Sequence, residues 1–193
     1  MFSNPSGLRT VRLGIVLSIF AIGFGFLLGG LFGAFEDTLK AGLNQQGQQV
    51  LATVYAGDTE KLQAVVNKSW SYFKRAHMHG GGIGTAALSL CLLLAWLPQS
   101  SRWWAKSILK RAASSALGLG AIGYSTFWLW AGWRAPAMGS TGAAKESLSG
   151  LAIPSAGLLL LGTFATLILV CLHLYLPTSS STEASPDLTS EVN

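Results

Sequence analysis

Four long stretches without a charged side chain limit what this chain can fold into. No Asp, Glu, Lys or Arg occurs in residues 13–35, 80–97, 112–133 and 153–176. A helix needs about 20 mainly apolar residues to cross the hydrocarbon layer of a bilayer, which is roughly 30 Å thick. Because backbone amides cannot be left unpaired in lipid, helix is the expected form of each stretch. The sequence therefore predicts an all-α integral membrane protein in which four transmembrane helices form a bundle within the lipid bilayer.

The segment between the first two stretches is predicted to be a helical hairpin outside the membrane. Apolar residues at helical spacing form one face of its second half: Leu62, Val65, Val66, Trp70 and Phe73. The preceding sequence, Gly57-Asp58-Thr59-Glu60, has the composition of a helix N-cap. A second apolar stripe marks the first half: Leu39, Leu43, Val50 and Val54. These two stripes predict two helices that pack together over residues 36–79.

The rest of the chain divides at the ends of the four stretches. The tail is rich in Ser and Thr, poor in large apolar side chains and free of basic residues, which predicts disorder. The predicted organisation is a cytoplasmic N-terminal segment (1–12), transmembrane helix 1 (13–35), the outer, periplasmic hairpin (36–79), transmembrane helix 2 (80–97), a basic cytoplasmic loop (98–111), transmembrane helix 3 (112–133), an outer loop (134–152), transmembrane helix 4 (153–176) and a disordered acidic cytoplasmic tail (177–193).

The positions of the basic residues predict the orientation. Two groups flank the apolar stretches: Arg9 and Arg12, then Arg102, Lys106, Lys110 and Arg111. Short loops rich in Lys and Arg stay in the cytoplasm, so both termini are expected there. The basic residues behind the net charge of +5 thus indicate the orientation in the membrane and do not indicate a nucleic-acid partner. The chain has only two cysteines, and both lie within apolar stretches, so they do not form a disulfide framework. This feature and the simple topology agree with a bacterial inner (plasma) membrane.

Small residues recur at every fourth position in the first and third stretches. The first stripe is Gly25, Gly29 and Gly33, and the second is Ala112, Ala116 and Gly120. In lipid, helices associate mainly by close packing, and small residues let two backbones approach. The stripes predict packing within the bundle or contact with other membrane subunits, including a homo-oligomer formed through Gly25, Gly29 and Gly33.

His77 and His79 are the main candidate ligands. They precede Gly80-Gly81-Gly82, and glycine accepts backbone angles that would open the helix there. An extended backbone would let both imidazoles and the Glu36 carboxylate bind one zinc, copper or iron ion. A single histidine could instead be an axial haem ligand. In an unbroken helix, however, the two rings point in nearly opposite directions and have packing roles, while Glu36 pairs with Arg134.

No enzymatic motif is present, and no catalytic residue is predicted. The chain has no phosphate-binding loop, Cys-x-x-Cys pair or nucleophile elbow. The apolar stretches lack the charged residues of a coupled transporter. The tryptophans at the ends of the stretches are typical of an interfacial belt, with a quinone or lipid pocket as the alternative. We therefore expect an accessory subunit or assembly factor of a larger membrane complex, with outer-face metal or haem binding, or a channel or carrier for a small neutral solute, as alternatives.

Overall fold

The structure is a computed structural model that describes residues 5–97 and 104–175. Within these ranges the chain is helical and has no strand. The helices are α1 (Pro5–Gln49), α2 (Leu51–Val54), α3 (Thr59–Trp96), α4 (Trp104–Met138), α5 (Thr141–Glu146) and α6 (Ser149–Tyr175). The predicted disordered tail, residues 177–193, and the first part of the predicted basic loop lie outside the described residues.

Three helices, α1, α3 and α6, are long and apolar enough to cross a membrane. The predicted third transmembrane stretch lies in α4, which is not among these three. That stretch contains serine, threonine and several glycines, which make it less apolar than the others. It packs against α1, α3 and α6, so protein covers several sides of α4. The structure therefore shows an all-helical protein with three apolar helices suited to contact with lipid.

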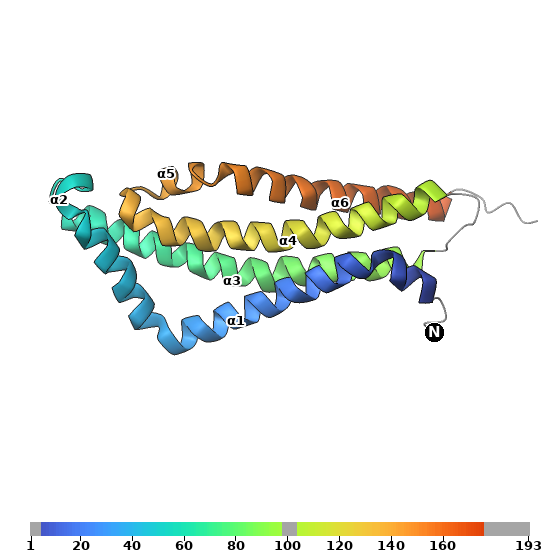
Figure 1. The fold of residues 1–193 in the computed structure, drawn as a ribbon, viewed down its shortest axis with the longest axis horizontal. Coiled ribbons are helices and arrows are strands. Elements are labelled where there is room, and N and C mark those ends of the chain that lie inside the picture. Colours follow the sequence, from blue (N-terminus) through green and yellow to red (C-terminus); the bar gives the residue numbers. More distant parts are fainter. Residues whose placement is uncertain (1–4, 98–103, 176–193) are drawn as a thin grey trace, which may run out of the picture.

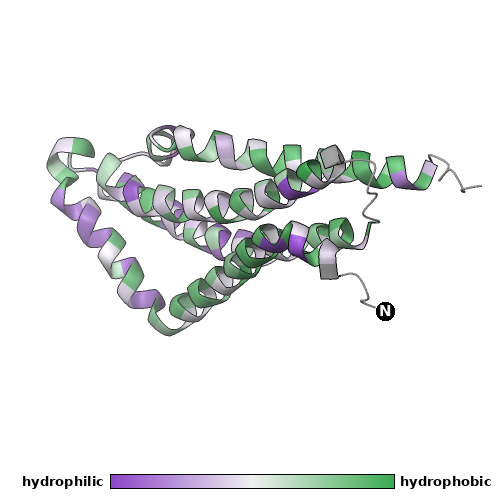
Figure 2. Ribbon diagram, turned by 45° about the vertical axis from the view of Figure 1, so that its right-hand side comes forward, coloured by the Kyte–Doolittle hydropathy of each residue, from purple (hydrophilic) through white to green (hydrophobic). Residues whose placement is uncertain are grey.

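The long helices lie side by side and share the same two ends (Figure 1). Both α1 and α4 pack on α3, and α6 packs mainly on α4. The start of α1, the end of α3, the start of α4 and the end of α6 gather at one end, while α2 and α5 lie at the other. Figure 2 shows that hydrophilic residues concentrate in the part of α1 that leads to α2.

α1 bends sharply at Phe35, whose backbone leaves the helical region (φ −129°, ψ 26°). The preceding residues include Gly29, Gly30 and Gly33, and glycine is among the poorest helix formers. Beyond the kink, residues 36–49 turn back towards the start of α3 (Figure 1). The kink falls where the first apolar stretch gives way to polar sequence, and it gives α1 two limbs with different directions.

α3 begins where the sequence predicts a cap and then continues further than predicted. The Asp58 side chain accepts a hydrogen bond of 2.8 Å from the Lys61 backbone N–H, which confirms the N-cap. Four residues of the predicted stripe, Leu62, Val66, Trp70 and Phe73, are buried, and the fifth, Val65, is half-buried. The helix then runs through the three glycines to Trp96 without a break. Of the two alternatives for residues 80–82, the structure therefore shows the unbroken helix and not the opened backbone.

One member of the helical triple glycine contacts a neighbouring helix. A Cβ atom on Gly80 would lie 2.8 Å from the Cα of Gly25, so the two backbones are in direct contact. The same kind of contact joins Gly14 of α1 to Ser114 of α4, and Gly120 of α4 to the Ser155 carbonyl of α6. Small residues thus bring the helix backbones together within the bundle, as expected for helices that lack a hydrophobic driving force in lipid.

The glycine stripe of α1 faces the inside of the protein over most of its length. Gly25 lies against the α3 backbone and Gly29 lies against the ring of His77, whereas nothing lies within 4 Å of a Cβ on Gly33. Of the two roles predicted for Gly25, Gly29 and Gly33, the structure shows packing within the bundle at Gly25 and Gly29, while a homo-oligomer stays a prediction.

The turn after α2 is fixed to the end of α4. The Tyr55 hydroxyl donates a buried hydrogen bond of 2.7 Å to the Pro136 carbonyl, and burial raises the pKa of Tyr55. Gly139, just beyond α4, has positive φ (65°), and its Cα lies against the side chain of Val54. These contacts hold the polar limb of α1 and the start of α3 near α4, which sets the width of the space between α1 and α4.

Candidate functional site

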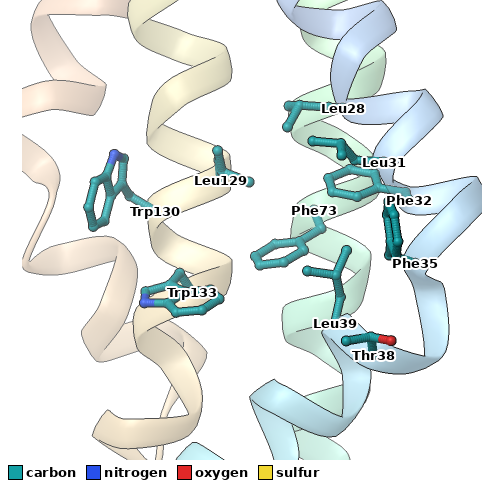
Figure 3. Close-up of a pocket in the computed structure, with 10 residues that line it drawn as sticks. All are labelled: Leu28, Leu31, Phe32, Phe35, Thr38, Leu39, Phe73, Leu129, Trp130 and Trp133. Carbon is teal, nitrogen blue, oxygen red and sulfur yellow. The ribbon is translucent and has the colours of Figure 1, made fainter.

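An apolar groove lies between α1 and α4. Its volume is about 530 Å³ (Figure 3). It is lined by six residues of α1, one of α3 and three of α4: Leu28, Leu31, Phe32, Phe35, Thr38 and Leu39; Phe73; and Leu129, Trp130 and Trp133. The α1 residues come from both sides of the kink, so the bend at Phe35 creates the groove.

Aromatic rings form much of the groove. The Phe73 ring lies at its centre, stacked on Phe32 at 5.6 Å and on Trp133 at 6.5 Å between centroids. The walls are open to the outside, since Leu31, Phe35, Trp130 and Trp133 are 40%, 53%, 51% and 44% exposed. A groove that is lined almost entirely by apolar side chains and is open sideways is suited to an apolar membrane constituent, which it would bind mainly through van der Waals contacts.

The groove becomes polar towards the kink. Thr38 carries the one hydroxyl among the lining residues. Next to it, Glu36 forms an ion pair with Lys40, and the hydrogen bond from Lys40 lowers the pKa of the Glu36 carboxyl, with a smaller contribution from Lys74. The Lys40 ammonium also lies 5.3 Å from the ring centroid of Trp70. Charged side chains that are not among the lining residues therefore lie beyond the kink, close in sequence to Thr38 and Leu39 at that end of the groove.

The structure does not bring His77, His79 and Glu36 together. His77 lies against α1, where its Nδ1 is 2.7 Å from the Gly25 carbonyl oxygen. His79 lies towards α4, with its ring centroid 5.2 Å from Tyr124. Residues two apart on a regular helix are separated by about 200° around the axis, so an unbroken α3 keeps the imidazoles apart. Across residues 5–97 and 104–175, no three His, Cys, Asp or Glu side chains could hold one metal.

Glu36 also lacks the partner expected of it. It pairs with Lys40, one turn along α1, and the expected pair with Arg134 is not formed. The three candidate metal ligands therefore lie apart in the structure, and haem binding by one histidine stays a prediction.

A basic and aromatic cluster surrounds His79 between α3 and α4. The Arg75 guanidinium lies 4.8 Å from the ring of Trp128 and 5.6 Å from that of Tyr72. The Trp128 Nε1 atom is buried and has no hydrogen-bond partner within the part of the chain that the structure describes. Cation–π contacts of this kind add to the attraction between neighbouring helices. The cluster therefore contributes to the contact of α3 with α4.

The sequence contained a partial signal for the groove. Phe32 and Phe35, like Trp130 and Trp133, are three residues apart near the end of an apolar stretch, so each pair lies on one helix face. The same pattern is typical of an interfacial aromatic belt. Only the kink and the position of α4 turn these residues towards a common space.

Comparisons with known proteins add no further information about this site. No protein-family model, no curated protein and no solved structure matches the chain. Function must therefore be inferred from the contacts of the molecule itself.

Proposed function

We propose that the protein is an integral membrane protein of four transmembrane helices that acts as an accessory subunit or assembly factor, without catalysis of its own. In this arrangement α4 is the fourth membrane helix. Its serines and glycines are accommodated because α1, α3 and α6 pack around it. The exposed apolar side chains of α1 and α6 face lipid or the helices of a larger complex.

One observation carries the proposal: the side chains best suited to chemistry are engaged in holding the helices together. His77 binds the Gly25 carbonyl and fills the space beside Gly29. Glu36 is held by Lys40, and the ring of His79 lies between α3 and the aromatic residues of α4. A protein that uses such groups for packing is suited to a role that depends on its shape and surfaces.

The proposed arrangement places α2, α5 and the hairpin at residues 36–79 on the outer side of a bacterial inner membrane. The apolar stripes of the hairpin pack together, since a Cβ on Gly47 would collide with the side chain of Leu62. Both termini then lie on the cytoplasmic side, together with the basic residues that precede α1 and surround the start of α4.

Cysteine labelling will test this orientation. In a background with Cys91 and Cys171 replaced by serine, a membrane-impermeant maleimide is expected to label Gln48→Cys in intact cells, because Gln48 is exposed on the outer limb. Ser180→Cys should react only after the membrane is permeabilised. The reverse pattern would place the groove's polar end and the hairpin in the cytoplasm.

The accessory role will be tested by the size and abundance of the native complexes. After mild solubilisation, the 20.3 kDa chain is expected to migrate with another membrane protein at fixed stoichiometry. Deleting the chain should reduce the amount of that complex. Migration as an isolated chain, with every membrane complex unchanged after deletion, would contradict the proposal. A haem absorption band in the purified chain would favour the single-histidine alternative.

A further inference from the structure

We infer that the groove between α1 and α4 is a binding site for one phospholipid, whose acyl chain fills the groove and whose phosphate lies at the kink of α1. This inference rests on the membrane location in the proposed function and is independent of the accessory role. It assigns a ligand class to the site from three observations: its size, its position along α1 and the charges at its polar end.

The size of the groove suits a single hydrocarbon chain. A methylene group is similar in volume to a water molecule in the liquid, about 30 Å³, so 530 Å³ holds roughly 17 such groups. The wall on α1 extends from Leu28 to Leu39, a helical rise of roughly 16 Å. A helix about 10 Å across would need on the order of 1,200 Å³ over that length. A whole partner helix would therefore extend well beyond the groove, whereas a single acyl chain fits within it.

The position of the groove matches the polarity of a phospholipid. Leu28, Leu31 and Phe32 belong to the apolar limb of α1, which spans the membrane in the proposed arrangement. Thr38 and Leu39 lie beyond the kink, where the polar limb begins. A molecule that follows the groove thus passes from hydrocarbon to the interface over its own length, as an acyl chain with its headgroup does.

The polar end carries a surplus of positive charge. Lys74 follows Phe73, and Arg134 follows Trp133, so each basic residue is next to a lining aromatic residue; both are exposed. Glu36 lies close enough to Lys74 for that ammonium to lower the pKa of its carboxyl, and it is paired with Lys40, so two cations face one carboxylate. One net positive charge is left to attract a phosphate at the level of the headgroups.

Lipid retention in the purified protein tests the inference. Native mass spectrometry of the wild-type chain, released from mild detergent, should show about one phospholipid per chain, as expected for a single formed pocket. Leu31→Trp fills the groove and should reduce this retention several-fold. Leu161→Trp, on the exposed face of α6 and away from the groove, should retain the lipid. Lys74→Glu, which reverses the charge at the polar end, should also reduce retention.

Tryptophan quenching provides a second measurement that does not depend on the filled variant. A phospholipid with a dibrominated acyl chain, added at equimolar amounts in detergent, should quench wild-type fluorescence. The variant with Trp130→Phe and Trp133→Phe should lose most of that quenching.

Several outcomes would overturn the inference. They are a wild-type chain without phospholipid, a retained quinone in its place, equal retention in Leu31→Trp, or unchanged quenching in the double variant. Unchanged retention in Lys74→Glu would contradict the placement of the phosphate. None of these results depends on the size of any native complex, so the accessory role succeeds or fails separately.

Discussion

Gly25→Leu is expected to prevent the bundle from folding stably. A Cβ atom at this position would collide with the backbone of Gly80 and Gly81, and backbone cannot move aside as a side chain can. Forcing α1 away from α3 would also break the hydrogen bond between His77 and the Gly25 carbonyl. Overpacking of this kind costs about 3 kcal/mol or more where the neighbouring atoms are backbone. Thermal unfolding in detergent and the yield of monodisperse protein will measure the loss.

Gly30→Leu is the matched control for this prediction. Gly30 lies on the same limb of α1, but nothing lies within 4 Å of a Cβ there. The melting temperature of Gly30→Leu should therefore be close to that of the wild type. The melting temperature of Gly25→Ala should lie between those of Gly25→Leu and Gly30→Leu. Similar melting temperatures for Gly25→Leu and Gly30→Leu would show that α1 does not pack on α3 through Gly25.

Val66→Asp is expected to destabilise the polar end of the protein strongly. Val66 is 3% exposed, and it lies where the second limb of α1 meets α3. An unpaired carboxylate buried in such a contact costs about 3–5 kcal/mol, because neither water nor a cation replaces its lost hydration. Limited proteolysis and hydrogen exchange should show opening of residues 36–73 before the rest of the bundle.

Asn67→Asp introduces the same charge one residue away and should be nearly neutral. Asn67 is exposed, and its side-chain oxygen accepts a hydrogen bond of 3.1 Å from Gln63, which an aspartate oxygen can also accept. If Val66→Asp and Asn67→Asp are cleaved by protease to the same extent, whether more than the wild type or no more, the burial of the Val66 face is contradicted.

The candidate site was only partly predictable from the sequence. The glycine spacing correctly indicated that Gly29 makes a close contact, but not that its partner is the ring of His77. The choice between a shared metal site and separated histidines depended on whether α3 breaks at Gly80. That segment is helical in the structure and lies against α1, in a contact that joins residues more than fifty positions apart in the chain.

The sequence by itself determined the helical class, the apolar stretches, the N-cap of α3 and its buried face. These features follow from local rules: lipid requires internally bonded backbone, and a helical period places every third or fourth residue on one side. Only the tertiary structure decided the groove, because the direction of α1 beyond Phe35 depends on the docking of Tyr55 against Pro136 and of Leu43 and Leu62 into one core. Contacts between residues far apart in the chain produce no periodic pattern in the sequence. They position aromatic residues, of a kind typical of an interfacial belt, so that these residues line the groove.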